Sequence, residues 1–159
     1  MNTAALQTHA NQTPEAAAAG NGIQFLNRLL NESLPAPPFA RTADIWPESF
    51  AVGRAVFVGH PSSRFYNPMG TVHGGWISAL LDTAMASAVH TALGPDQGYS
   101  TIELKSVFVK PVREDSGRLR CEGVLLHLGK RVAHAEGKVY NAAGELVAYG
   151  TESCMVFSR

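Results

Sequence analysis

The fold is decided by residues 64–93, which read RFYNPMGTVHGG and then WISALLDTAMASAVHTAL. A polar loop rich in turn-forming residues ends in the glycine pair Gly74-Gly75. In the segment that follows, apolar residues occur all around a helical projection rather than on one stripe, which predicts a helix buried on most sides. Gly94 and Pro95 come directly after this segment, and such a pair is a typical helix stop.

Asp82 is the only carboxylate in this apolar helix. A carboxylate in apolar surroundings costs several kcal/mol unless it is compensated, so Asp82 either bonds to a neighbouring element or serves in chemistry. The glycines at the helix start leave backbone N–H groups at the positive end of the dipole, where an oxygen can approach closely. A carboxylate and an N–H donor site in one small protein suggest acyl chemistry.

The spacing of these two features adds a constraint. Gly74 and Asp82 are eight residues apart, which is about 12 Å along a helix that rises roughly 1.5 Å per residue. A single carbonyl group cannot touch both residues. If they cooperate, Asp82 meets the Gly74 end of a second copy of the helix. The spacing therefore predicts a symmetric dimer with two equivalent sites, each built from both chains.

A fixed spacing links six residues of this region: Asn67-x-x-Gly70-x-x-His73-Gly74-Gly75, followed by Asp82. This spacing resembles the active-site signature of hotdog-fold acyl-CoA thioesterases. It is most similar to the phenylacetate-pathway (PaaI-type) branch of the 4-hydroxybenzoyl-CoA thioesterase superfamily, and the resemblance covers residues 50–157. The resemblance implies an α+β hotdog fold, with an antiparallel sheet wrapped around a long central helix. It also implies assembly into a dimer or a dimer of dimers.

The same resemblance implies roles for the catalytic candidates. The backbone N–H of Gly74 would polarise the thioester carbonyl. Asp82 would act either as a general base on water or as the nucleophile that forms a mixed anhydride. Asn67 would donate to the substrate carbonyl or hold the loop, as an Asn-Pro turn does. Thr101 would orient the attacking water beside Asp82; the adjacent Ser100 points to the other face of a strand, so only one of the two can do so.

The remaining candidates concern substrate binding. His73 and Gly75 are expected to shape the loop and the helix start. Trp76 is expected to line the acyl pocket, although core packing explains this residue equally well. The phosphates of coenzyme A need cations at the pocket rim. Four candidates, each also an ordinary turn charge, are Lys110, Arg113, Lys130 and Arg131.

The rest of the chain predicts a flexible tail, residues 1–20, and a single domain, residues 21–159. An amphipathic helix is expected over residues 23–34, ended by Pro35. The breaks at 116–117, 129–130 and 141–144 predict hairpin turns, and hence an antiparallel sheet packed on the central helix. Five strand-like runs are expected, at 48–59, 99–109, 118–128, 131–140 and 145–157.

Composition narrows the classes of partner. The chain has 159 residues, of which 13 are basic and 13 acidic, and no cluster of Lys or Arg, which argues against nucleic acid or an anionic membrane. Two cysteines outside any Cys-x-x-Cys pair and six scattered histidines show no metal-ligand spacing. With no secretory signal and no apolar run of about 20 residues, we expect a cytoplasmic protein.

Together these observations predict an acyl-CoA thioesterase that hydrolyses an aromatic or medium-chain acyl-CoA to the free acid and coenzyme A. No cofactor is expected, since coenzyme A is part of the substrate. One alternative is a non-catalytic acyl-CoA-binding hotdog module, which the presence of Asp82 disfavours. Another is an enoyl-thioester hydratase, which the absence of a His–acid pairing around the central helix disfavours. The acyl group, and the choice between coenzyme A and carrier-protein thioesters, stay open.

Overall fold

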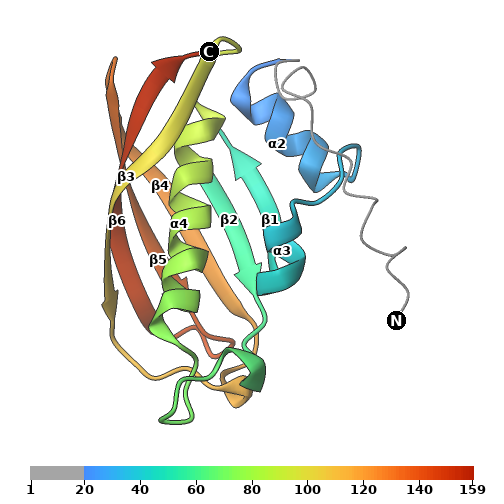
Figure 1. The fold of residues 1–159 in the computed structure, drawn as a ribbon, viewed down its shortest axis with the longest axis vertical. Coiled ribbons are helices and arrows are strands. Elements are labelled where there is room, and N and C mark those ends of the chain that lie inside the picture. Colours follow the sequence, from blue (N-terminus) through green and yellow to red (C-terminus); the bar gives the residue numbers. More distant parts are fainter. Residues whose placement is uncertain (1–19) are drawn as a thin grey trace, which may run out of the picture.

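The computed structural model describes residues 20–159, in which one sheet curls around a single long helix, α4 (Gly74–Thr91) (Figure 1). The predicted tail lies outside the described residues, apart from Gly20. Within the described part of the chain the six strands follow the order β1-β2-β4-β5-β6-β3, and each neighbouring pair is antiparallel. The predicted α+β class and the antiparallel sheet around a central helix are therefore confirmed.

The strands differ from the expected runs in two respects. Residues 48–59 belong to two strands rather than one, because Gly53, with φ of 78°, turns the chain between them. The prediction of a hairpin at 116–117 is wrong, because β3 pairs with β6 and not with β4. The chain reaches β4 through a 3-10 turn at Glu114–Ser116. The bounds are β1 (Ile45–Ala51), β2 (Arg54–Gly59), β3 (Gln97–Phe108), β4 (Leu119–Leu128), β5 (Val132–Tyr140) and β6 (Leu146–Ser158).

Two short helices precede the sheet. The amphipathic helix, α2 (Gly22–Leu30), ends earlier than expected, and α3 (Pro38–Ala43) was not expected. The α2 helix packs against the C-terminal end of α4, where the ring centroids of Phe25 and His90 lie 5.4 Å apart. Burial lowers the pKa of His90 to about 4, so this ring is neutral at pH 7. None of the helices in residues 20–159 has the length and apolar character needed to cross a membrane.

The core lies between α4 and the inner face of the sheet, and α4 approaches β4 very closely. Leu80, Leu81 and Met85 have no exposed surface. A Cβ atom at Gly123 of β4 would collide with the carbonyl oxygen of Ala84 and would lie 2.7 Å from the backbone nitrogen of Met85. Only glycine leaves room for the helix backbone at this point.

Replacing Gly123 by alanine is therefore expected to lower the free energy of unfolding by about 3 kcal/mol, because the methyl group must push α4 away from β4. Gly94→Ala is the matched control, since its Cβ would come no closer than 3.4 Å to Gln97. Thermal denaturation of the two variants measures the difference. Equal midpoints for both would contradict the close packing of α4 on β4.

Candidate active site

One side of α4 faces the edge strand β3, and polar groups run between the two elements. At four-residue intervals this side carries Gly74, Ser78 and Asp82, each half-buried, and residues so spaced share one face of a helix. The Ser78 hydroxyl lies 3.0 Å from that of Ser106 on β3, and the Thr101 hydroxyl lies 3.1 Å from Oδ1 of Asp82. We call these five residues the α4–β3 stripe.

One backbone donor at the start of α4 forms no hydrogen bond to the described residues. His73 caps the helix, because its Nδ1 accepts a hydrogen bond of 2.9 Å from the N–H of Gly75. Its own N–H donates to the carbonyl of Phe65 at 2.8 Å. Within the described residues, the N–H of Gly74 donates to no such partner. Gly74 therefore offers its N–H at the positive end of the helix dipole, while Gly75 and His73 shape the turn.

Asn67 holds the loop before the helix. Its Oδ1 accepts hydrogen bonds from the N–H groups of Met69, at 2.9 Å, and Thr71, at 3.3 Å. Its Nδ2 donates to the Thr71 hydroxyl at 2.9 Å. Of the two roles considered for Asn67, this geometry favours the one in which the amide fixes the loop.

Thr101 and Ser100 lie on opposite faces of β3. Thr101 pairs with Cys154 of β6, whose side chain is fully buried, so it points inward to Asp82. Ser100 is exposed and pairs with Met155, which is exposed as well. The hydroxyl beside the carboxylate is therefore that of Thr101.

Glu152 is a residue of this region that the sequence did not single out. It lies on β6 and is only 2% exposed; its Oε1 lies 2.9 Å from the hydroxyl oxygen of Thr101 and accepts a hydrogen bond of 2.9 Å from the thiol of Cys154. Its Oε2 is buried without a partner among the described residues. Burial raises the pKa of Glu152 to about 7, and the nearby charge of Asp82 also acts to raise it. A signal was present in the sequence: Glu152 lies two residues from Gly150 and two from Cys154, so the three share one face of the strand.

Trp76 belongs to the core. Its side chain is 8% exposed, its Nε1 donates to the carbonyl of Ala43 at 2.7 Å, and its ring stacks on Phe65 with centroids 5.2 Å apart. Of the two explanations offered for this residue, the structure shows core packing against α3 and the loop.

The four candidate cations lie at two ends of the molecule. Lys130 and Arg131 are exposed in the turn between β4 and β5, and the Arg131 carbonyl accepts from the N–H of Val156 near the end of β6. This turn lies at the opposite end of α4 from Gly74 (Figure 1). At the Gly74 end, Arg113 donates to the carbonyl of Gly70 at 3.3 Å. Lys110 is also exposed and forms an ion pair of 2.7 Å with Glu145.

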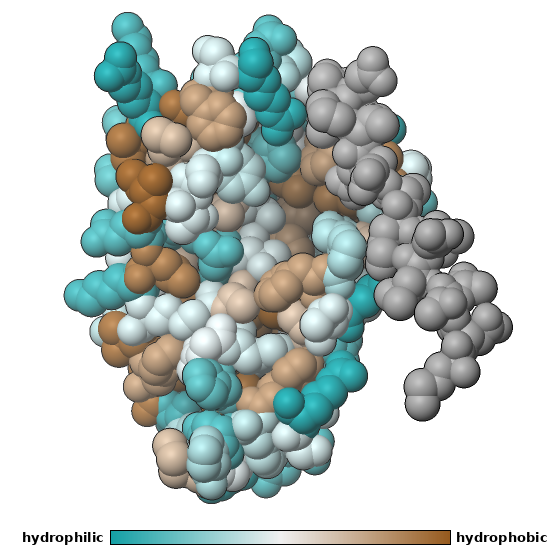
Figure 2. Space-filling view, in the orientation of Figure 1, coloured by the Kyte–Doolittle hydropathy of each residue, from teal (hydrophilic) through white to brown (hydrophobic). Residues whose placement is uncertain are grey.

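The outer edge of β3 is open to a second chain. This strand ends the sheet order, so no strand of the described chain pairs with that edge. It exposes the large apolar side chains of Ile102, Leu104 and Phe108. Apolar patches alternate with hydrophilic side chains along the left margin of Figure 2, part of which β3 forms. An exposed edge of this kind is a template for pairing with another strand.

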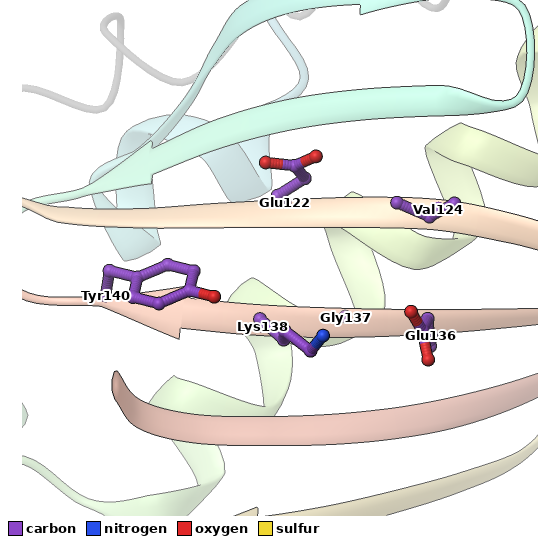
Figure 3. A pocket seen from close by; sticks show the side chains of 6 residues that line it. All are labelled: Glu122, Val124, Glu136, Gly137, Lys138 and Tyr140. Atoms are coloured by element: carbon purple, nitrogen blue, oxygen red, sulfur yellow. The ribbon is translucent and has the colours of Figure 1, made fainter. Parts of the chain in front are cut away.

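A hollow on the other face of the sheet is separate from these groups. It has a volume of about 240 Å³ and is formed by side chains of β4 and β5 (Figure 3). Glu122 on its rim forms ion pairs with Arg54 and Arg120. The hollow therefore lies across the sheet from the α4–β3 stripe and contains none of its residues.

Two other kinds of chemistry find no support in the described chain. Between residues 20 and 159, no three His, Cys, Asp or Glu side chains are grouped so that they could hold a metal ion. Both cysteines are buried, and burial raises the pKa of the Cys154 thiol to about 12 and that of the Cys121 thiol even further. Because the thiolate is the reactive form, neither cysteine is suited to act as a nucleophile.

Comparison with known proteins agrees with this architecture. No curated protein matches the sequence. A phenylacetic acid degradation-related protein from Ralstonia eutropha is 30% identical, with a TM-score of 0.74 over 81% of this chain and 97% of the other. A variant of the phenylacetic acid degradation protein PaaI from Thermus thermophilus is 27% identical, with a TM-score of 0.68 over 75% of this chain and 98% of the other.

A third structure, AziG of S. sahachiroi, is 22% identical and shares the fold, with a TM-score of 0.75 over 79% of this chain and 100% of the other. The family model of the thioesterase superfamily matches residues 69–148, which include the whole of α4 and β3. The architecture is the hotdog fold of these relatives. By its sequence and its fold, the chain belongs to the thioesterase superfamily, and within it the chain is similar to the PaaI-type proteins.

Proposed function

We propose that the protein is an acyl-CoA thioesterase that hydrolyses aromatic or medium-chain acyl-CoA to the free acid and coenzyme A. One observation carries the proposal: a half-buried carboxylate, Asp82, and the Gly74 N–H, a backbone donor without a partner in residues 20–159, lie on the same side of α4. Thioester hydrolysis needs a group that activates water and a donor for the oxyanion. Membership of the thioesterase superfamily supports the same reaction.

The proposed site needs two chains. Eight residues of helix separate Gly74 from Asp82, about 12 Å in length, so the two cannot meet at one carbonyl. If two copies join along their β3 edges in antiparallel fashion, Gly74 of one copy comes to face Asp82 of the other. The exposed apolar side chains of β3 support such a contact. Two such dimers can associate further into a dimer of dimers.

In the proposed reaction, the thioester carbonyl oxygen accepts a hydrogen bond from the Gly74 N–H, and Asp82 of the other copy faces the carbonyl carbon. As a general base, Asp82 takes a proton from water while the hydroxide adds to this carbon. The tetrahedral intermediate then collapses, the C–S bond breaks, and the protonated Asp82 returns its proton so that coenzyme A leaves as the thiol. As a nucleophile, Asp82 would form a mixed anhydride instead. Label in Asp82 after a single turnover in ¹⁸O-water would identify the anhydride path, because direct attack of water on the thioester places label only in the product acid.

The proposed binding of coenzyme A uses cations at the end of the molecule that holds Gly74. Arg113 lies there in the same chain. In the antiparallel dimer, the Lys130-Arg131 turn of the other copy would reach the same end. Phosphate groups are held well by such side chains. The reaction needs no cofactor, and a cytoplasmic location remains a prediction from the sequence.

The test is the release of free thiol from a panel of aromatic and aliphatic coenzyme A esters, together with the matching carrier-protein thioesters. We expect release from the preferred ester with kcat/KM above about 10⁴ M⁻¹s⁻¹, the lower end of the usual range for enzymes. Asp82→Asn, purified in the same way, excludes a contaminating hydrolase. Binding of the esters without release of thiol would contradict the proposal and favour the acyl-CoA-binding module.

A further inference from the structure

The hydroxyl of Thr101 lies between two carboxyl groups. It is 3.1 Å from Oδ1 of Asp82 and 2.9 Å from Oε1 of Glu152. Asp82 comes from α4, Thr101 from β3 and Glu152 from β6, so three elements converge on one oxygen atom. The two acids are 70 residues apart in the sequence, and Thr101 joins them.

The two acids cannot both be ionised if each of these contacts is a hydrogen bond with a proton of its own. A threonine hydroxyl has one proton to donate and two lone pairs that accept. If Asp82 and Glu152 were both carboxylates, Thr101 could donate to only one of them. The other contact would then bring two acceptor oxygens together without a proton. One acid must therefore carry a proton and donate it to Thr101.

Burial decides which acid carries this proton. Glu152 is 2% exposed and its Oε2 has no partner among the described residues, whereas Asp82 is half-buried on the open side of α4. Leaving a charge in the less solvated place costs more free energy. The proton therefore belongs on Glu152.

The other groups around Glu152 agree with this assignment. On β6, Cys154 donates its thiol proton to Oε1 of Glu152. On β3, burial raises the pKa of Tyr99 above its usual range, so this phenol is neutral. The neighbours on β5, Ala133 and Ala135, are apolar and fully buried. No cation acts on Glu152 from the described elements packed around it, so its ionised form has no charge partner.

We propose that Glu152 is a positioning residue for Asp82: it holds a proton, donates it to Thr101, and so directs the Thr101 hydroxyl proton to Oδ1 of Asp82. This inference rests on the proposed thioesterase function, because it concerns the orientation of the proposed catalytic carboxylate. The bond from Thr101 fixes Oδ1 and leaves Oδ2 of Asp82 for water or for the substrate carbon. Ionised Glu152 would compete for the Thr101 proton and place a second negative charge beside Asp82.

The direction in which activity changes with pH follows from this arrangement. Since Glu152 positions Asp82 only while it is protonated, activity falls as the pH rises through the pKa of Glu152, near 7. We expect kcat of the wild type to fall by at least about fivefold from pH 6 to pH 9. In Glu152→Gln a neutral amide donates to Thr101 at every pH. The variant is expected to lose about two- to fivefold in kcat at pH 6, because an amide is a weaker donor than an acid, and to lack the alkaline fall.

Glu152→Ala provides the contrast, since it removes the donor altogether. We expect a loss of about tenfold or more in kcat with little change in KM, and again no alkaline fall. A merely structural role for Glu152 would leave the shape of the pH profile unchanged in both variants. An alkaline fall of equal size in the wild type and in Glu152→Gln would overturn the proposal.

A spectroscopic measurement tests the proton directly and needs no substrate. The infrared difference spectrum of the wild type minus Glu152→Gln should contain the C=O band of a protonated carboxylic acid at pH 6, and this band should vanish by pH 9. If Glu152→Gln does not fold, the loss of this band between pH 6 and pH 9 in the wild type alone tests whether Glu152 carries the proton. Thiol release with no such band overturns the inference about Glu152. The band without thiol release contradicts the thioesterase proposal instead.

Discussion

Asp82→Asn is expected to lower kcat for acyl-CoA hydrolysis by at least about 100-fold, the usual contribution of a general base. The amide can neither accept a proton from water nor attack the thioester. Its Oδ1 can still accept the hydrogen bond that Thr101 donates to Asp82, so the packing between α4 and β3 should persist. The loss should therefore appear in kcat, with the thermal midpoint unchanged or slightly raised. Steady-state kinetics and thermal denaturation of the same sample measure both.

The matched control is Asp96→Asn, because Asp96 is exposed in the turn between α4 and β3. This variant carries the same change of charge and should behave as the wild type. If Asp82→Asn retains activity within about tenfold of the wild type, the carboxylate is neither base nor nucleophile. The acyl chemistry would then have to be carried by a group other than Asp82.

Gly74→Pro is expected to lower kcat by about 100- to 1,000-fold, the cost of removing one oxyanion donor. Proline removes the N–H without removing the helix, since the first position of a helix is where proline is best tolerated. The preceding residue, His73, has φ of −61° and ψ of 133°, an extended conformation that is compatible with a following proline. The variant therefore separates the donor from the fold, and circular dichroism confirms that α4 persists.

Gly74→Ala is the control for volume. Its Cβ would lie 3.0 Å from Cζ of the Phe108 ring, a contact that the proline variant shares. Because this contact is with the far end of the Phe108 side chain and not with backbone, a small shift of the ring relieves it, and we expect the alanine variant to stay within about fivefold of the wild type. An equal loss in both variants would assign the effect to crowding against Phe108, and the Gly74 N–H would have no role in the reaction.

The two variants together test whether a site contains residues of both chains. A mixed dimer of Asp82→Asn and Gly74→Pro, purified through two different tags, keeps one intact site only if each site takes Gly74 from one chain and Asp82 from the other. If each site draws on both chains, this dimer should recover about half the activity of the wild-type dimer. If both groups act within one chain, the mixed dimer should be as inactive as either parent.

The sequence by itself determined the central helix, its start and stop, and the two main candidates for the chemistry. These features are local. The loop, the glycine pair and Asp82 lie within residues 64–93, and the helix requires only its own periodicity and end signals. The α+β class followed as well, since the later strands are separated by recognisable turns. For the hairpins β4–β5 and β5–β6 the turn residues were sufficient, because each connects neighbours in the sheet.

The tertiary structure alone decided how β3 is paired. The loop between β3 and β4 spans residues 109–118, which is longer than the two to five residues of common hairpins. It carries the chain from the edge strand β3 past β6 and β5 to β4, and β3 pairs with the last strand, β6, instead. Which strand pairs with β3 depends on how much of each strand α4 can bury, and turn residues give no information about that burial.

The tertiary structure also decided which face of a strand is inside. On β6 the large side chains Tyr149, Met155 and Phe157 point outward and are exposed, while Glu152 lies on the buried face. An apolar–polar alternation places such residues the other way round. On β3 the structure likewise decided that Thr101 faces inward and Ser100 outward. A strand has no preference of its own for either face, so the inward set is chosen by the helix and strands that pack on it, and these come from distant parts of the chain.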